Sequence, residues 1–318
     1  MSQRMNDPPV SVIVCAYNGA GFLAATLDSA LAQTWSAFEL IVIDDGSTDG
    51  SPDLLRQYTD PRLRTIRQEN RGAAAALQAG IDVARGKYVA LLDQDDLWEP
   101  DKLQCHVDVL ESKPSLDLTF SWFRVIDGQG SDIGLHSTRH RGAISFSDLL
   151  RDFVIGAASN VVIRRGALSR VPVDAGLPRV YDWDLFLRIA LLAPDNIEAI
   201  PRDLMRYRRR TGQISSNVDS LKQEWLQALE KLRGLAPLRV APVEKLARSN
   251  MNRYFARLDY ERAFYASGLE HLSEGFHIAP LAFLADSRNW LTAAACFTGL
   301  ALPPRVHRRL ERLAGLRR

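Results

Sequence analysis

The chain has 318 residues, which suits a catalytic domain that carries a further segment of roughly 100 residues. Its 40 Lys and Arg against 38 Asp and Glu give a formal net charge of +2, which argues against a nucleic-acid partner but leaves local charge clusters open. Cys15, Cys105 and Cys296 are widely spaced and odd in number, so we expect neither a disulfide framework nor a zinc site. This usage fits a cytoplasmic protein, and residues 1–9 contain no apolar run of signal-peptide length.

The first half of the chain alternates short apolar runs with helical patterns. Strands are predicted at 10–16, 40–43, 63–66 and 88–92, and helices at 22–32, 52–58 and 73–84. This alternation predicts an α/β fold with a mostly parallel sheet flanked by helices. If the strand order is 3-2-1-4, ligands bind beyond the carboxyl ends of the first and fourth strands. Asp93 and Asp95 would then lie beside Ala16, Tyr17 and Asn18.

The second half of the chain is less regular. A helix at 102–112 and a strand at 118–125 are predicted, followed by a loop at 127–142 whose Gly, Ser and His content indicates mobility. We then expect a strand at 160–163, a helix at 183–192 that begins at Asp182, and an extended segment at 204–208. From about Asp219 the pattern is helical. We therefore place a catalytic domain at 1–219 and a helical C-terminal region at 220–318.

An apolar run at 89–92 ends in three carboxylates within four positions, Asp93, Asp95 and Asp96. This pattern predicts a buried strand that delivers acids to a site. Such a cluster repels itself unless it holds a cation, and Mg²⁺ or Mn²⁺ prefers carboxylate oxygens together with substrate phosphates. The alternative is a polar turn after a strand, because Asp is common in turns.

Two other strand ends also carry polar side chains. Tyr17 and Asn18 follow the first strand, and Asp44 and Asp45 follow the second. Because the carboxyl ends of parallel strands meet at one edge of a sheet, these groups predict a shared site with Asp93. An ordinary Asx or Ser/Thr turn that caps the next helix is the alternative for residues 44–50.

Four motifs follow one another in the sequence: VIVCAYN at 12–18, ELIVIDDGSTD at 39–49, NRG at 70–72 and DQDD at 93–96. In order and spacing they resemble the inverting glycosyltransferases of family 2, which have the GT-A fold, and the resemblance extends over about 9–216. It implies that Ala16, Tyr17 and Asp45 line the nucleobase pocket. It also implies that Asp93 approaches the ribose or the metal, and that Asp95 binds the metal on the donor diphosphate. The same motifs place Asn18, Asp44 and Gly72 among the residues that bind the nucleotide sugar.

The segment YDWDLFLR at 181–188 resembles the acceptor-side motif of the family, in which the acid before the aromatic residue is the general base. The resemblance assigns that role to Asp182 and leaves Asp184 as the next candidate. The family often has Glu where this chain has Tyr181, so the hydrogen bonding around the base should differ. Asp182 could also serve as a helix N-cap.

Arg210 ends the segment YRRR at 207–210, where the family usually has His. Arg does not ligate cations but pairs with phosphate through two hydrogen bonds, so we expect Arg210 to contact the diphosphate or a charged acceptor. A solvated basic surface is the alternative. A mobile loop at 127–142 or 210–216 could exclude water from the site.

Residues 290–302 are uncharged and mainly apolar but too short to span a bilayer. Arginines follow at 305, 308, 309, 312, 317 and 318 against a single acid, Glu311. Such a segment can lie in the interface of an anionic membrane, or it can be a core helix with a solvated basic end.

The sequence therefore predicts a metal-dependent inverting glycosyltransferase. The resemblance implies a nucleoside diphosphate sugar as donor, UDP-linked, and a saccharide or lipid-linked saccharide as acceptor, in bacterial cell-surface polysaccharide or lipopolysaccharide synthesis at the inner face of the cytoplasmic membrane. A nucleotidyltransferase that makes sugar nucleotides and a non-catalytic sugar-nucleotide sensor are the alternatives. A dinucleotide fingerprint, GAGFLA at 19–24, is disfavoured because three residues separate it from the strand.

Overall fold

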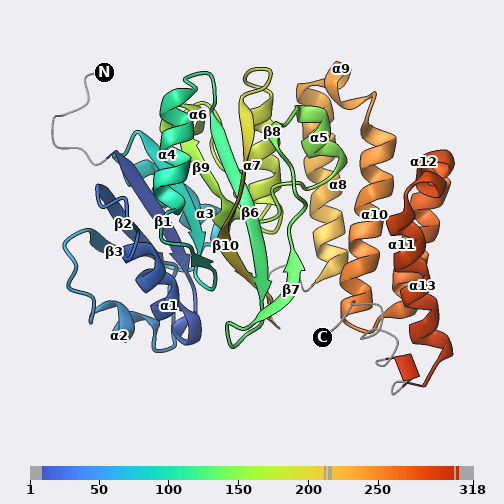
Figure 1. Ribbon diagram of the computed structural model, residues 1–318, viewed down its shortest axis with the longest axis horizontal. Helices are drawn as coiled ribbons and strands as arrows, with labels where there is room; N and C mark the ends of the chain where they lie inside the picture. Colours follow the sequence, from blue (N-terminus) through green and yellow to red (C-terminus); the bar gives the residue numbers. More distant parts are fainter. Residues whose placement is uncertain (1–8, 211–212, 214–216, 304–305, 308–318) are drawn as a thin grey trace. The chain divides into compact units, whose positions relative to one another are not determined.

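The computed structural model describes residues 9–210, 213, 217–303 and 306–307 (Figure 1). The chain forms two compact units. The first comprises Met1–Phe146 and Val154–Arg210, and the second comprises Ser147–Phe153 and Thr211–Arg318. The boundary that we proposed at 219/220 lies inside helix α8 (Val218–Leu235), which belongs to the second unit.

The described part of the first unit is built on a ten-stranded sheet with the order β3-β2-β1-β4-β9-β6-β10-β5, while β7 pairs with β6 and β8 with β10. The predicted order 3-2-1-4 is confirmed, with these four strands parallel. Strand β9 runs antiparallel to both of its neighbours, β4 and β6. The strands are β1 (Val10–Ala16), β2 (Phe38–Asp44), β3 (Leu63–Arg67), β4 (Tyr88–Asp93), β5 (Leu97–Trp98), β6 (Leu118–Ile126), β7 (Asp132–His136), β8 (Gly142–Ala143), β9 (Val161–Arg164) and β10 (Ile197–Arg208).

Helices cover both faces of the sheet, which explains why β1, β2 and β4 are buried and mainly apolar along their length rather than alternating. Leu23 and Leu27 of α1 and Leu103 of α4 share a core with the side chains of β1 on one face. On the other face α3 lies so close to β1 that a Cβ at Gly80 would stand 2.5 Å from the Ile13 side chain. The helical segments of the first unit are α1 (Ala20–Leu31), α2 (Ser51–Leu55), α3 (Ala73–Val83), α4 (Lys102–Ser112), the 3₁₀ turn η1 (Ala158–Asn160), α6 (Arg165–Leu168) and α7 (Tyr181–Ala190). Helix α5 (Phe146–Arg151) belongs to the second unit except for its first residue.

The continuous loop predicted at 127–142 is wrong in part, because this segment contains β7 and the start of β8. Asp127 closes a tight turn by accepting hydrogen bonds from the backbone N–H groups of Gln129 and Ser131 at 2.9 Å. The chain then returns along β6, and Ile133 and Leu135 pack against the core. The sequence pattern missed this strand because only two apolar residues alternate in it. The other loop expected to close the site, 210–216, lies largely outside the described residues.

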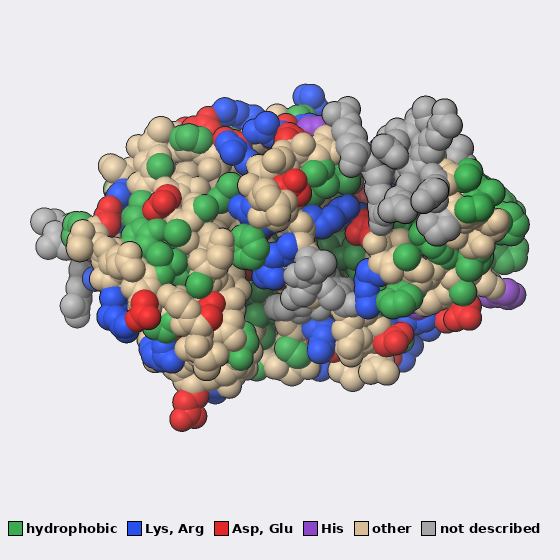
Figure 2. Space-filling model, turned by 90° about the horizontal axis from the view of Figure 1, so that it is seen from below, with side chains coloured by type: hydrophobic (Ala, Val, Ile, Leu, Met, Phe, Trp, Pro, Cys, Tyr) green, Lys and Arg blue, Asp and Glu red, His purple; other side chains and the backbone are tan. Residues whose placement is uncertain are grey.

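The second unit is helical where it is described, with α8, α9 (Pro237–Val240), α10 (Glu244–Glu261), α11 (Tyr265–Ile278), α12 (Pro280–Ala285) and α13 (Ser287–Ala301). Arg253 of α10 is buried and pairs with Asp152 at 2.9 Å and with Asp286 at 2.7 Å, which joins three segments of this unit. Hydrophobic side chains also gather on the surface of the C-terminal helices (Figure 2). None of the helices in the described residues is long and apolar enough to cross a membrane.

Candidate active site

The carboxyl ends of β1, β2 and β4 bring the predicted polar residues together. In the parallel register Ala16 lies opposite Asp44, and Cys15 lies opposite Asp93. Tyr17 follows at the same edge with 46% of its surface exposed. The side-chain amide of Gln94 continues the pairing beyond β4, since it accepts from Tyr17 N at 2.9 Å and donates to Tyr17 O at 3.0 Å. The shared edge predicted from the sequence is therefore present.

Asn18 and Asp44 fix the loops at this edge. Asn18 has a φ of +49°, and its Oδ1 accepts a hydrogen bond from Thr48 N at 2.8 Å. Asp44 is 1% exposed, accepts from Ser47 N at 2.9 Å and pairs with Arg67 at 2.7 Å. Asp44 thus forms the Asx-type turn that was the alternative for this loop. Its buried carboxylate holds the loop after β2 in place.

Asp45 ties the end of β2 to the NRG motif. Its carboxylate accepts hydrogen bonds from Gln68 Nε2 at 2.7 Å, Arg71 N at 2.9 Å and Gly72 N at 2.8 Å. Gly72 has a φ of +86°, a conformation that favours glycine, and α3 begins directly after it. One buried carboxylate, that of Asp45, therefore holds the NRG motif against the ELIVIDDGSTD motif.

The acidic turn after β4 is held from two sides. On one side Ser159 Oγ accepts from Asp93 N at 2.9 Å and donates to Asp96 Oδ2 at 2.6 Å. On the other side Arg208 N donates to Asp96 Oδ1 at 2.8 Å, and Arg208 Nε donates to Asp95 O at 2.7 Å. Asp96 is only 1% exposed. It therefore anchors the turn, while Asp93 and Asp95 are the acids that this anchor presents.

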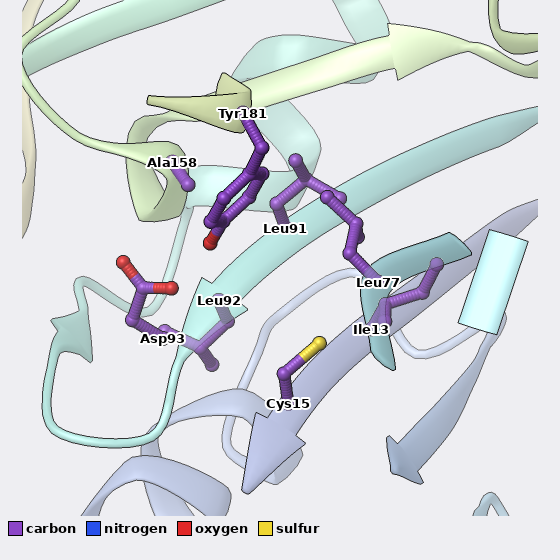
Figure 3. Close-up of a pocket in the computed structure, with 8 residues that line it drawn as sticks. All are labelled: Ile13, Cys15, Leu77, Leu91, Leu92, Asp93, Ala158 and Tyr181. Carbon is purple, nitrogen blue, oxygen red and sulfur yellow. The ribbon is translucent and has the colours of Figure 1, made fainter. Parts of the chain in front are cut away.

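Two carboxylates, those of Asp95 and Asp182, lie close enough to Asp93 to influence its pKa. Burial raises the pKa of Asp93 to about 7, and the negative charges of Asp95 and Asp182 add to the shift. Burial also raises the pKa of Asp182 to about 6. The pKa of Tyr181 is raised by burial and by the charge of Asp93. In a small pocket between β1, β4 and α7, the Tyr181 hydroxyl and the Asp93 carboxylate point into the same space, with Cys15 opposite (Figure 3).

The two candidate bases in α7 have different surroundings. Asp182 lies in the first turn of the helix and is partly exposed, with a hydrogen bond from Trp183 N at 2.8 Å. Asp184 is 1% exposed and its Oδ2 accepts from Arg188 Nε at 2.8 Å. The N-cap of α7 is Val180, so the proposal that Asp182 is an N-cap is wrong. Asp184 therefore has a structural ion pair, whereas Asp182 lies close enough to Asp93 for its charge to raise the pKa of that group.

The acids fit a hard divalent cation by their chemistry. Asp93 and Asp95 supply carboxylate oxygens, and burial together with the charges of Asp95 and Asp182 makes ionisation of Asp93 unfavourable, which a cation would relieve. Among the described residues no group of three or more His, Cys, Asp or Glu side chains is arranged to hold a metal. Magnesium sites usually take one or two carboxylates and complete the shell with substrate phosphates and water, so a pair is enough.

Arg210 lies against the acid that was expected to bind the metal. Its Nε donates to Asp95 Oδ2 at 2.6 Å, and its guanidinium lies 5.1 Å from the centre of the Phe22 ring. Arg208 stacks over the same ring at 5.2 Å. The solvated basic surface considered from the sequence is thus wrong for Arg210, because this side chain is part of the site.

Ser159 and Gln94 are site residues that sequence reasoning missed. Ser159 precedes β9 and is 66 residues from Asp93 in the chain, so no local pattern marks it. Gln94 lies inside the DQDD motif, but its role depends on a backbone that comes from β1.

Comparison with known proteins shows the family to which the chain belongs. The family described as Glycosyl transferase family 2 matches residues 11–171. A β-1,3-glucosyltransferase of Escherichia coli, WfgD, is described as using UDP-Glc and α-D-GlcNAc-diphosphoundecaprenol. It is 30% identical over 70% of this chain and 85% of its own length. TuaG of Bacillus subtilis is described as a putative teichuronic acid biosynthesis glycosyltransferase. It is 34% identical over 69% of this chain and 86% of its own length.

Solved structures agree on the fold. S. aureus TarS in complex with UDP-GlcNAc superimposes with a TM-score of 0.65 at 16% identity, over 90% of both chains. The mannosyltransferase PcManGT of Pyrobaculum calidifontis, in complex with GDP-Man and Mn²⁺, gives 0.55 at 20% identity over 98% of this chain and 86% of its own. The fold is of the GT-A type with helices added at the C-terminus. The chain belongs to glycosyl transferase family 2 and is a glycosyltransferase.

Proposed function

We propose that this glycosyltransferase moves a sugar, with inversion, from a UDP-linked donor to a hydroxyl of a saccharide or lipid-linked saccharide. The observation that carries the proposal is the convergence of Asp95 and Asp182 on Asp93, because the charges of both add to the effect of burial in raising the pKa of Asp93. Such a group of acids can assist both the departure of the diphosphate and the attack of the acceptor hydroxyl. Two acids can hold a cation at the donor diphosphate, and the third can accept a proton.

Asp182 is proposed as the general base. It takes the proton of the acceptor hydroxyl while that oxygen attacks the anomeric carbon, and the bond from the anomeric carbon to the diphosphate oxygen breaks. A single displacement of this kind inverts the anomeric configuration. A pKa of about 6 leaves Asp182 ionised at neutral pH but more basic than an ordinary Asp, which suits proton transfer.

The donor is proposed to bind along the edge formed by β1, β2 and β4. Ala16, Tyr17 and Asn18 follow one strand, Asp44 and Asp45 lie at the next, and Gly72 is held against Asp45. Asp93 would approach the ribose, and Arg210 would contact the diphosphate. Mg²⁺ or Mn²⁺ held by Asp95 and Asp93 would neutralise the charge of the departing diphosphate.

Relatives support the choice of donor and acceptor. WfgD is described as using UDP-Glc with a lipid diphosphate acceptor, and a TarS structure contains UDP-GlcNAc. PcManGT was solved with Mn²⁺. We therefore propose a role in bacterial cell-surface polysaccharide or lipopolysaccharide synthesis. We place the reaction in the cytoplasm at the inner face of the membrane, which is compatible with three cysteines that are all unpaired.

A non-catalytic sugar-nucleotide sensor would need the donor edge but not the base. The raised pKa of Asp182 favours an enzyme, because a binding module gains nothing from a carboxylate poised near neutral pH. A nucleotidyltransferase is disfavoured by family membership.

The test compares Asp182→Asn with Asp184→Asn on UDP-sugars and a saccharide acceptor. Asp182→Asn keeps the size of the side chain but cannot accept the proton, so turnover should fall by about 10²-fold to 10⁴-fold with donor affinity little changed. Asp184→Asn breaks the ion pair with Arg188. It should therefore lower the melting temperature while turnover changes little. Near-normal turnover in Asp182→Asn would refute the assignment. Full activity in excess chelator would refute the metal requirement.

A further inference from the structure

The outward face of α13 is apolar. Trp290, Leu291, Phe297 and Leu300 are large hydrophobic side chains with 53%, 62%, 64% and 54% of their surface exposed. Trp290, Ala294 and Phe297 recur at the spacing that places residues on one side of a helix. A helix at the surface of a soluble protein normally presents polar residues to water. The outward face of α13 presents apolar residues instead, which is typical of an interaction surface.

The exposed face is not an incomplete core, because the inward side of α13 is already packed. Ala295 and Cys296 are buried, and a Cβ at Gly268 of α11 would stand 2.8 Å from Cys296 Sγ. At Gly299 a Cβ would stand 2.6 Å from the ring of Tyr265. The helix is therefore fixed to its own unit by one side, which leaves the other side for a partner.

The preceding helix extends the apolar surface. Leu281 and Leu284 of α12 are 84% and 46% exposed, and Trp290 Nε1 donates to Leu284 O at 3.0 Å, which joins the two helices at this surface. We call these outward residues of α12 and α13 the apolar face (Figure 2): Leu281, Leu284, Trp290, Leu291, Phe297 and Leu300.

Charge indicates which partner the apolar face suits. The sequence contains no charged residue between Arg288 and Arg305. Beyond that run the chain is strongly basic, with arginines at 305, 308, 309, 312, 317 and 318 against Glu311 alone. A second copy of this chain would add a segment with charge of the same sign, so it offers no charge complementarity. An anionic surface attracts them, by up to about 1 kcal/mol for each basic residue near it.

We propose that α12 and α13 attach this protein to the surface of an anionic lipid membrane, with the apolar face at the boundary of headgroups and acyl chains. The fifteen residues of α13 extend about 22 Å, less than the roughly 30 Å hydrocarbon core, so the helix lies in the interface rather than crossing it. The inference goes beyond the proposed reaction and does not depend on it, although it would bring the enzyme to lipid-linked acceptors.

The test is flotation of the full chain with phosphatidylglycerol–phosphatidylcholine vesicles and with phosphatidylcholine vesicles. Leu291→Ser with Phe297→Ser removes two exposed side chains from the apolar face. Leu235→Ser with Leu238→Ser is the matched control, since these residues are 64% and 89% exposed in the same unit but outside that face. We expect flotation with the anionic vesicles that weakens with salt, at least a tenfold loss for the first double variant, and no loss for the control.

A second measurement keeps the proposal testable if the double variant folds poorly. Vesicles of brominated lipids should quench part of the tryptophan fluorescence of the unmodified chain, and Trp290→Phe should remove that part. Equal flotation of both double variants, no flotation of the unmodified chain at low salt, or quenching unchanged by Trp290→Phe would each overturn the proposal. Self-association that is lost in the Leu291 and Phe297 double variant without any lipid binding would assign the apolar face to a second copy instead.

Discussion

The acidic cluster should destabilise the protein when no cation is bound, and Asp93→Asn measures by how much. A pKa of about 7 in the folded chain, against about 3.9 for an unfolded Asp, is a difference of about 3 units. Since each unit corresponds to about 1.36 kcal/mol, ionised Asp93 costs up to about 4 kcal/mol.

The sign of the effect fixes its pH dependence. The folded protein holds the proton of Asp93 more tightly than the unfolded chain does, so stability falls as the pH rises from about 4 to about 7. Asp93→Asn should therefore gain only about 1.5 kcal/mol at pH 5 but about 4 kcal/mol at pH 8.5. For a domain of this size, the larger figure corresponds to roughly 8–16 °C in melting temperature.

The assay is thermal or urea unfolding of both proteins at the two pH values, with and without Mn²⁺. Mn²⁺ should stabilise the unmodified chain more than Asp93→Asn, so the difference in free energy of unfolding between the two proteins should become smaller. Asp108→Asn is the control, since Asp108 is exposed on α4 away from the cluster. A gain that is equal at pH 5 and pH 8.5, or equal in both variants, would refute the reasoning.

Three further predictions concern neighbouring residues. The transfer rate should rise about tenfold per pH unit below about pH 6 and level off above it, because Asp182 must be ionised; a rate profile flat from pH 5 to 8 would contradict this. Ser159→Ala removes the donor to the buried Asp96 Oδ2 and should lower the free energy of unfolding by about 1–3 kcal/mol, measured in urea; unchanged stability would show that the hydroxyl is not an anchor. Arg210→Ala should strengthen Mn²⁺ binding by freeing Asp95 Oδ2 and weaken UDP-sugar binding, both measured by calorimetry; weaker Mn²⁺ binding would contradict the competition.

The sequence was sufficient for the parts of the fold that depend on local pattern. Strands β1, β2 and β4 are buried on both faces, so they contain mostly apolar runs, and their order with β3 agrees with short right-handed crossovers. Strand β7 was missed because it is an edge strand with a weak apolar pattern. Strand β10 was predicted only at 204–208 but begins at Ile197, since Pro201 and Arg202 interrupt its pattern where its register with β6 shifts.

The candidate site divides in the same way. Asp93 and Asp95 were found because they follow a strand whose end is fixed by its hydrophobic run. The pairing of Arg210 with Asp95 was not predicted. It depends on where β10 ends relative to β4, and the spacing of residues in the sequence does not reveal such a long-range contact.

The reversed direction of β9 has a consequence for how this site can vary. A parallel strand brings its last residues to the ligand edge, but an antiparallel strand brings the residues that precede it. The turn before β9 therefore lies against the acids of β4, although it belongs to a connection that starts far away in the chain. Substitutions in that connection can reposition the acids without altering any strand, so differences in activity among relatives can arise in a segment that contains none of the four motifs.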